Sequence, residues 1–332
     1  MRKDPLFLKS DYLAAAISSL ISLAVYVYTT APNVTLLDSG EFLVAAQHFG
    51  VPHPTGYPLW TLLSWLFQLL PLGNAAWEVA LLSALFAAAA VGLATMLLQS
   101  TLRWIFADSP LFTHRVLPYC VSTGCALLMA FSQPMWSQAV IAEVYALHAF
   151  LVCLFLICQY AWIRNPASLG LLLLSFFLLS LAFSNHQLSL ALAPLPFLGV
   201  LLLRRELFWD LLIASLLTLL LVYLGFAILS ADPPVLKTAI RFFYFVAMVF
   251  GIRLILRRFR IEWRLIAFLP FAVLLGMLPY AYLPFASSTN PPMNWGYTRT
   301  VEGFYYSFNR SQYGGSLSDQ SLRTLGKLMG VS

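Results

Sequence analysis

Apolar runs separated by short polar segments dominate the chain. There are ten of them, at residues 12–30, 59–72, 76–99, 116–133, 146–163, 167–184, 187–203, 208–230, 235–252 and 265–285. A helix needs about 20 apolar residues to cross a bilayer, and most of these runs approach or exceed that length. The run at 59–72 is too short to cross and is expected to form a helix that lies at the membrane interface. The pattern therefore predicts an all-α polytopic membrane protein with about nine transmembrane helices, the first of which is not cleaved.

The placement of basic residues supports the same count. If 59–72 does not cross, most of the Lys and Arg residues fall on one side of the membrane, as expected of the cytoplasmic side. This group holds 13 of the 19 basic residues: Arg2, Lys3, Lys9, Arg103, Arg115, Arg164, Arg204, Arg205, Arg253, Arg257, Arg258, Arg260 and Arg264. A crossing segment at 59–72 would instead separate the first three from all later ones. The bias predicts a cytoplasmic N-terminus and an extracytoplasmic C-terminal tail.

Composition excludes most soluble classes of protein. Apolar residues make up 61% of the chain and charged residues only 10%, whereas about a quarter of a soluble domain is charged. The net charge of +6 then reflects membrane topology, so we expect contact with membrane lipids and no nucleic-acid partner. The four cysteines lie inside apolar runs and lack zinc-site spacing. We divide the chain into a transmembrane domain, residues 1–285, and an outer tail, residues 286–332.

The first outer loop, residues 31–75, contains Asp38, Glu41, His48 and His53 but no Lys or Arg. Carboxylates near a membrane surface are costly unless something binds them. This favours a site in which a carboxylate acts as a general base or holds a divalent cation, with histidine as a second polar group. The spacing fits equally well a capping box in which Asp38 caps a helix and Glu41 binds back. Both interpretations stay open, and the residues demand no cofactor.

Within this loop, Ser39 and Gly40 are expected to form a break before a short helix over Glu41–Phe49. Phe42, Ala45, Ala46 and Phe49 would share one face of it at helical spacing, and that face is expected to lie on the membrane surface. Gly50 is expected to end the helix.

Further polar residues are predicted to reach the same outer face. Glu143 precedes the run at 146–163, and His186 occupies a corner between two runs. In the tail, Asn294 and Trp295 are suited to hydrogen bonding and stacking on a sugar, and Arg310 is suited to binding a phosphate. A lone histidine at a corner can equally be structural, and the aromatic residues can form an interfacial belt. The convergence of these residues on one face favours a site.

Four segments resemble the motifs of a membrane family long catalogued as a domain of unknown function. They are LLDSGEFLVAAQHFGVPHPTGYPLW, EVYALHAF, SNHQ and NPPMNWGYTRTVEGFYYSFNRSQYGG, in this order across residues 36–315. That family is now grouped with protein O-mannosyltransferases of the GT-C glycosyltransferase class. The resemblance implies a GT-C-like helical bundle with an acidic catalytic residue and interfacial helices in the first outer loop. Members often continue with further spans or an outer domain, so the chain is expected to be a short or truncated member.

The resemblance also implies an activity and roles for residues. The chain would transfer a sugar, typically mannose, from a polyprenyl-phosphate donor to a hydroxyl of a protein, lipid or glycan, with inversion. Asp38 would be the general base and Glu41 would assist it. His53 resembles the His-Pro element of the mannosyltransferases. Glu143, His186 and Arg310 would line the donor site, with Arg310 on the phosphate.

The spacing of the acidic residues differs from that of the mannosyltransferases. Asp38 and Glu41 are separated by two residues, whereas the mannosyltransferases carry an adjacent acidic pair, so either carboxylate could be the base.

A transporter or flippase for a lipid-linked precursor is the alternative function, and a non-catalytic assembly subunit is a third. A transporter would place charged residues at mid-span. The expected location is the plasma or inner membrane of a bacterium or the endoplasmic reticulum of a eukaryote.

Overall fold

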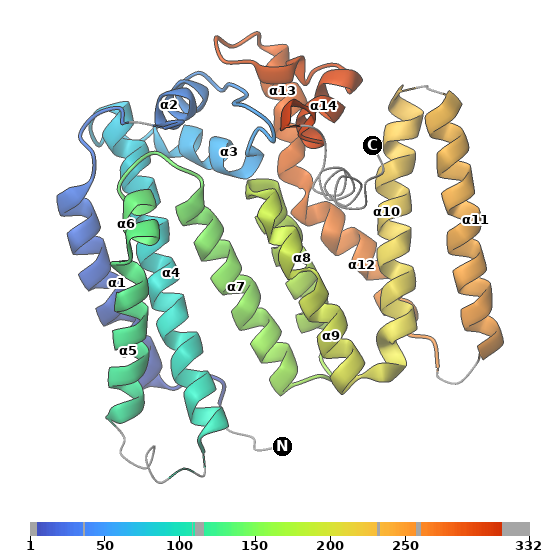
Figure 1. Cartoon of the computed structure of the whole chain (residues 1–332), viewed down its shortest axis with the longest axis horizontal. Helices are drawn as coiled ribbons and strands as arrows, with labels where there is room; N and C mark the ends of the chain where they lie inside the picture. The colour runs from blue at the N-terminus through green and yellow to red at the C-terminus, as the bar shows by residue number, and fades with distance from the viewer. Residues whose placement is uncertain are drawn as a thin grey trace, which may run out of the picture.

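The computed structural model describes residues 5–35, 37–107, 109, 116–230, 233–256 and 260–313. In this part of the chain the regular structure is helical, apart from an isolated parallel bridge between Val51 and Asn294. The helices that make up the bundle are α1 (Lys9–Thr29), α4 (Ala75–Ile105), α5 (Leu117–Ala130), α7 (Tyr145–Arg164), α8 (Leu169–Asn185), α9 (Pro194–Leu203), α10 (Phe208–Ser230), α11 (Pro233–Leu256) and α12 (Trp263–Gly276) (Figure 1). The predicted all-α architecture is confirmed for the described residues.

Five of these segments are long and apolar enough to cross a membrane alone: α1, α4, α7, Arg205–Leu229 and Val235–Ile255. A sixth span would be the bent pair formed by α12 and Leu278–Ser288. Shorter apolar helices cover Leu117–Ala130, Leu169–Asn185 and Gln187–Leu203, the last of which joins the 3-10 helix η2 (Gln187–Leu192) to α9. These segments match the predicted runs, but their lengths establish a multi-pass membrane protein and not the count of nine. The part of the predicted basic cluster at Arg2, Lys3, Arg115, Arg257 and Arg258 lies outside the described residues.

Small residues bring the first helices close together. α4 packs against α1, α5 and α7. Ala84, Ala87 and Ala88 are almost fully buried on α4 beside Tyr26 of α1, and short side chains of this kind let helix backbones approach. Tyr26 also donates a 2.8 Å hydrogen bond from its hydroxyl to the carbonyl of Ala130 at the end of α5. This half of the bundle is the frame on which the first loop rests.

The apolar run at 265–285 does not form one unbroken helix, because the helix breaks after Gly276. α12 is followed by the 3-10 helix η4 (Leu278–Ala281) and by α13 (Tyr282–Ser288), with a bend of 48°. A Cβ on Gly276 would lie 2.5 Å from the carbonyl oxygen of Phe177 on α8, so glycine permits this close contact. Pro279 has no N–H and cannot continue the helical hydrogen bonds. The bend turns α13 toward α3 (Figure 1).

The short elements gather at one end of the bundle (Figure 1). They are α2 (Ser39–Gln47), α3 (Pro58–Phe67), α13, the 3-10 helix η5 (Trp295–Tyr297), α14 (Val301–Phe308) and the 3-10 helix η6 (Ser311–Tyr313). Another short helix, α6 (Gln133–Ala139), leads from α5 toward α7, and the 3-10 helix η3 (Arg205–Leu207) precedes α10. With only 10 residues, α3 is about 15 Å long and cannot cross a bilayer.

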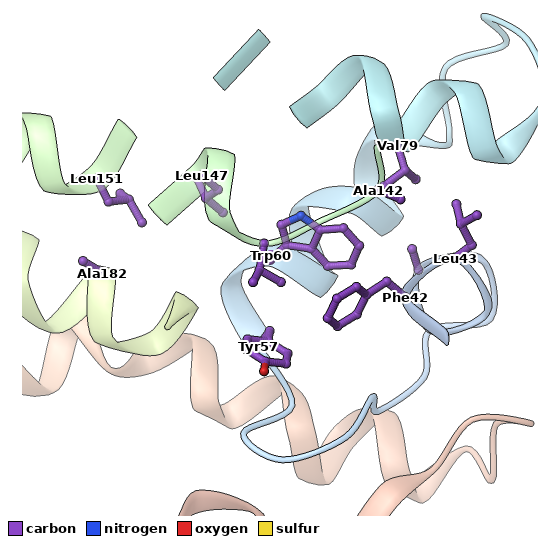
Figure 2. Close-up of a cluster of buried hydrophobic side chains, with 11 residues drawn as sticks. Phe42, Leu43, Tyr57, Trp60, Val79, Ala142, Leu147, Leu151 and Ala182 are labelled. Carbon is purple, nitrogen blue, oxygen red and sulfur yellow. The ribbon is translucent and has the colours of Figure 1, made fainter. Parts of the chain in front are cut away.

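A buried cluster fixes α2 and α3 on the bundle, and Figure 2 shows Trp60 at its centre. Trp60 and Phe42 are each 1% exposed, and their ring centroids are 5.0 Å apart. Ala45 and Ala46 are fully buried as well. The expectation that this face of the first-loop helix lies on the membrane surface is therefore wrong, because it packs against protein. Burying each large side chain contributes roughly 1.5–3 kcal/mol.

The boundaries of α2 also differ from the expected Glu41–Phe49. The helix begins at Ser39, so the expected break at Ser39 and Gly40 is wrong, and both residues belong to its first turn. The buried Ser39 hydroxyl donates to the Ala142 carbonyl at 3.1 Å, which ties this turn to the bundle. It ends at Gln47, where Phe49 takes the left-handed conformation (φ 52°) and the Gly50 N–H donates to the Ala45 carbonyl. This is a Schellman-type end, and the helix ends two residues earlier than expected.

Candidate active site

A histidine and a carboxylate are locked together beside α2. The backbone N–H of His53 donates to one carboxylate oxygen of Glu41, and the ring Nδ1 lies 3.2 Å from the other. The other ring nitrogen, Nε2, lies 3.0 Å from the hydroxyl of Tyr57. His53 is only 8% exposed. Both of its nitrogens are engaged, so its ring orientation is fixed by Glu41 and Tyr57.

The turn that carries His53 depends on glycine. Gly56 has φ +78°, a conformation that other residues rarely adopt, and a Cβ there would lie 2.7 Å from Leu283 Cδ2. Tyr57 follows with φ 38° and precedes the first residue of α3, Pro58. Proline suits the first turn of a helix because it has no N–H to leave unpaired. The HPTGYP sequence thus folds the chain back so that His53 and Tyr57 face each other.

Asp38 lies at the start of α2 with its side chain exposed. Although it occupies the N-cap position, its carboxylate makes no capping hydrogen bond. Glu41 binds His53 instead of the N-cap backbone. The capping-box interpretation is therefore wrong, and Asp38 is exposed to a ligand. Ligand atoms of Asp38, Glu41 and His53 lie within 4.8 Å of one another, a donor set that suits a divalent cation in type.

Glu143 adds a second, buried carboxylate. It is 4% exposed in the segment between α6 and α7. Burial raises its pKa to about 7, and the negative charge of Asp38 adds to this effect; the hydrogen bond from the Val144 N–H and the nearby His53 oppose it. Asn185 holds this segment in place by donating to the Val144 carbonyl at 3.1 Å. Glu143 therefore changes between neutral and charged forms near neutral pH.

His186 stands at the end of α8 against the same turn. Its ring stacks on Tyr57 with a centroid distance of 5.9 Å and also contacts Tyr145 and His148 of α7. Burial lowers its pKa to about 4, and the neighbouring His148 and Arg310 act in the same direction. Its Nδ1 accepts a hydrogen bond from the Leu188 N–H. The neutral ring therefore carries its proton on Nε2, where it can donate to a ligand.

Arg310 brings a positive charge to this group from the segment after α14. The end of α14 is tied to the His186 corner, because the side chain of Gln187 donates to the Phe308 carbonyl at 2.7 Å. The guanidinium lies over the ring of Tyr313 at 4.9 Å, and its charge acts on Tyr57 and His186. The buried Nε of Arg310 has no hydrogen-bond partner within the described residues. Leaving such a donor unpaired costs about 1–3 kcal/mol, which an anionic ligand would offset.

Asn294 and Trp295 lie beside this group and have no direct contact with its carboxylates among the described contacts. The Val51 N–H donates to Met293 and the Trp295 N–H donates to Val51, which fastens the tail to the segment before His53. Gly50 permits this approach, since a Cβ there would lie 2.7 Å from the Met293 carbonyl. Trp295 is 38% exposed. Residues 314–332 of the predicted outer tail lie outside the described residues.

The structure thus brings six of the eight predicted residues to one place: Asp38, Glu41, His53, Glu143, His186 and Arg310. Sequence reasoning missed Tyr57, which joins His53 to His186. Its position four residues after His53 in the HPTGYP motif was the available signal. Tyr145 and His148 belong to the EVYALHAF motif but were not predicted as site residues; their i, i+3 spacing places them on one face of α7.

Known proteins are similar to this chain over the segments that carry the candidate site. A family model described as the protein O-mannosyl-transferase TMEM260 N-terminal domain matches residues 38–209. The protein O-mannosyl-transferase tmem260 of Dictyostelium discoideum is 25% identical across 94% of this chain and 33% of the relative. The mouse protein O-mannosyl-transferase TMEM260 is 26% identical across 92% of this chain and 35% of the relative.

The chain therefore spans about a third of the length of these curated relatives. No solved structure matches it. The family match includes Asp38, Glu41, His53, Glu143 and His186 and ends before the tail residues. These matches confirm the resemblance to protein O-mannosyltransferases that the motifs indicated.

Proposed function

The chain belongs to the family of the protein O-mannosyl-transferase TMEM260 N-terminal domain, and from this premise we propose that it is a mannosyltransferase. Its substrates would be a polyprenyl-phosphate mannose donor and a serine or threonine hydroxyl of a protein. The observation that carries the proposal is the convergence of Asp38, Glu143, His186 and Arg310 at one end of the bundle. That group combines a base, a neutral hydrogen-bond donor and a cation, which are the parts that this transfer needs.

Asp38 is the better candidate for the general base. Glu41 is engaged by two contacts to His53 and is largely shielded, whereas Asp38 is exposed and makes no capping bond. Glu41 then positions His53, which in turn positions Tyr57. This assigns different roles to the two carboxylates that the sequence could not separate.

The proposed reaction is a single displacement at the anomeric carbon of mannose. The acceptor oxygen forms a bond to this carbon while the bond from the carbon to the phosphate oxygen breaks, so the configuration inverts. The acceptor proton goes to Asp38, and the electron pair of the broken bond stays on the phosphate. Arg310 stabilises the negative charge that develops on this leaving group.

Glu143 and His186 bind and orient the sugar in this proposal. The uncharged ring of His186 donates a hydrogen bond from Nε2, and Glu143 accepts hydrogen bonds from sugar hydroxyl groups when it is ionised. Asn294 and Trp295, at the edge of the site, would contact the acceptor or the outer face of the sugar. Asp38, Glu41 and His53 are the residues that would hold a divalent cation, and no step of the proposed mechanism is routed through one.

The proposal includes a topology. A GT-C-like bundle with nine spans would have a cytoplasmic N-terminus and an extracytoplasmic catalytic loop at residues 31–75. The membrane would be the endoplasmic reticulum in a eukaryote or the plasma or inner membrane in a bacterium. Two ion pairs favour an enzyme over a transporter: Asp11 pairs with Arg103 and Asp210 with Arg253, and these four residues lie near helix ends and not at mid-span.

The direct test supplies purified protein in lipid nanodiscs with labelled polyprenyl-phosphate mannose and a serine-containing peptide. We expect label in the peptide and none in a matched peptide with alanine in place of each hydroxyl residue. Nucleotide-linked mannose should give no product. Transfer from the nucleotide sugar, or no transfer from the lipid donor by protein that binds it, would contradict the proposal.

A further inference from the structure

A polar pocket lies at the end of the bundle opposite the candidate active site, where η3 leads into α10 and residues 260–262 lead into α12 (Figure 1). Its volume is about 450 Å³. Its charged and aromatic lining consists of Arg204, Glu206, Arg260, Glu262, Trp263 and Arg264. None of these residues has a part in the proposed transfer reaction.

Buried contacts hold the walls of this pocket in place. Asp210 is fully buried and accepts a hydrogen bond from Arg253 of α11 at 2.9 Å. Its other oxygen accepts from the backbone N–H of Glu262, also at 2.9 Å. Arg204 donates to the Pro166 carbonyl at 2.8 Å. The backbone on both sides is therefore fixed before any ligand binds, which lowers the entropic cost of binding.

The charges of the pocket do not cancel. Arg204 pairs with Glu206, and Arg264 lies 3.6 Å from Glu262. Within the part of the chain that the structure describes, Arg260 has no such carboxylate partner. Three guanidinium groups and two carboxylates leave one positive charge. Guanidinium groups bind phosphate oxygens in a planar, two-pronged arrangement, so a group with one negative charge would complete the pocket.

The surroundings indicate where such a group would come from. Trp263 is 58% exposed and Arg264 exposes 78% of its side chain, both at the first turn of the apolar helix α12. Exposed tryptophan and arginine at the end of an apolar helix are typical of the headgroup layer of a membrane. Basic pockets between helices at that depth bind lipid headgroups.

We infer that this pocket binds the phosphodiester of an anionic phospholipid headgroup. A phosphodiester carries one negative charge, which matches the excess charge on the lining. This site is independent of the proposed mannosyl transfer, since it lies at the other end of the bundle.

Binding of phosphatidylglycerol and phosphatidylcholine to the purified full chain, counted by native mass spectrometry, tests this inference. Arg260→Gln should weaken phosphatidylglycerol binding about tenfold, because it removes a charge-assisted contact. Arg205→Gln is the matched control: it removes the same charge from the adjacent turn, where Arg205 is exposed and does not line the pocket. The control should bind phosphatidylglycerol as the unchanged protein does.

Equal losses in both variants would show a general effect of charge and overturn the inference, as would full binding by Arg260→Gln. Inorganic phosphate at millimolar concentration should not displace phosphatidylglycerol; displacement would identify a site for free phosphate instead. If Arg260→Gln fails to fold, the exposed Arg264→Gln replaces it with the same expected loss.

Discussion

Replacing Glu143 with glutamine should stabilise the protein above neutral pH and have little effect near pH 4.5. Burial raises the pKa of this carboxyl from 4.5 to about 7 in the folded protein. Because the folded-state pKa is the higher one, the unfolded chain loses its proton first as the pH rises. The stability that the neutral carboxyl contributes is therefore present below about pH 4.5 and is lost as the pH rises to about 7.

The size of this loss follows from the shift in pKa. The shift from 4.5 to about 7, at about 1.4 kcal/mol for each pH unit, corresponds to roughly 3 kcal/mol. Glutamine keeps the shape of the side chain and can still accept the hydrogen bond from the Val144 N–H, but it never ionises. Glu143→Gln should therefore raise the melting temperature by several degrees at about pH 8.

Thermal unfolding in detergent, followed at pH values from about 4.5 to 8.5, measures this effect. Glu302 provides a matched control, because it is an exposed carboxylate on α14, and Glu302→Gln should leave the pH profile unchanged. If the Glu143→Gln protein melts at a lower temperature than the unchanged protein at about pH 8, then the ionised carboxylate has a stabilising partner and the argument from burial is refuted.

Three further predictions concern other contacts. Gly56→Ala should destabilise the protein by about 1–2 kcal/mol, since its φ of +78° and the nearby Leu283 disfavour a side chain; a melting temperature equal to that of the unchanged protein would contradict this. Asp210→Asn should cost about 3–5 kcal/mol by breaking the buried ion pair between Asp210 and Arg253, measured in the same way. Arg310→Gln should weaken binding of the lipid-phosphate donor about tenfold in an equilibrium binding assay, while peptide binding stays unchanged; equal donor binding would remove Arg310 from the phosphate site.

The fold was largely predictable from the lengths of the apolar runs. The runs became helical in the described residues, because unpaired backbone groups are too costly in a membrane. Two of them divide: 187–203 forms η2 and α9, and 265–285 forms α12, η4 and α13. The place of the break after Gly276 could not be predicted, since the close approach of Gly276 to the Phe177 carbonyl depends on how α12 packs against α8. The buried face of α2 was mistaken for a membrane-facing one because an apolar stripe has the same spacing in either setting.

The site was predictable where its residues belong to local motifs. Asp38, Glu41 and His53 lie in one loop. The two carboxylates are conspicuous because the loop contains no Lys or Arg. The burial of Glu143 and the stacking of Tyr57 on His186 depend on how segments that are distant in the sequence pack together. Such distances between distant segments have no signal in a single sequence.

The rate of mannose transfer by Asp38→Asn tests the central proposal most directly. Purified protein would receive labelled polyprenyl-phosphate mannose and a serine-containing peptide, and binding of the donor would be measured in parallel. Removing a general base should lower the rate by about a hundredfold or more, while donor binding and melting temperature stay unchanged and Glu302→Gln keeps full activity. Full activity of Asp38→Asn would contradict the account.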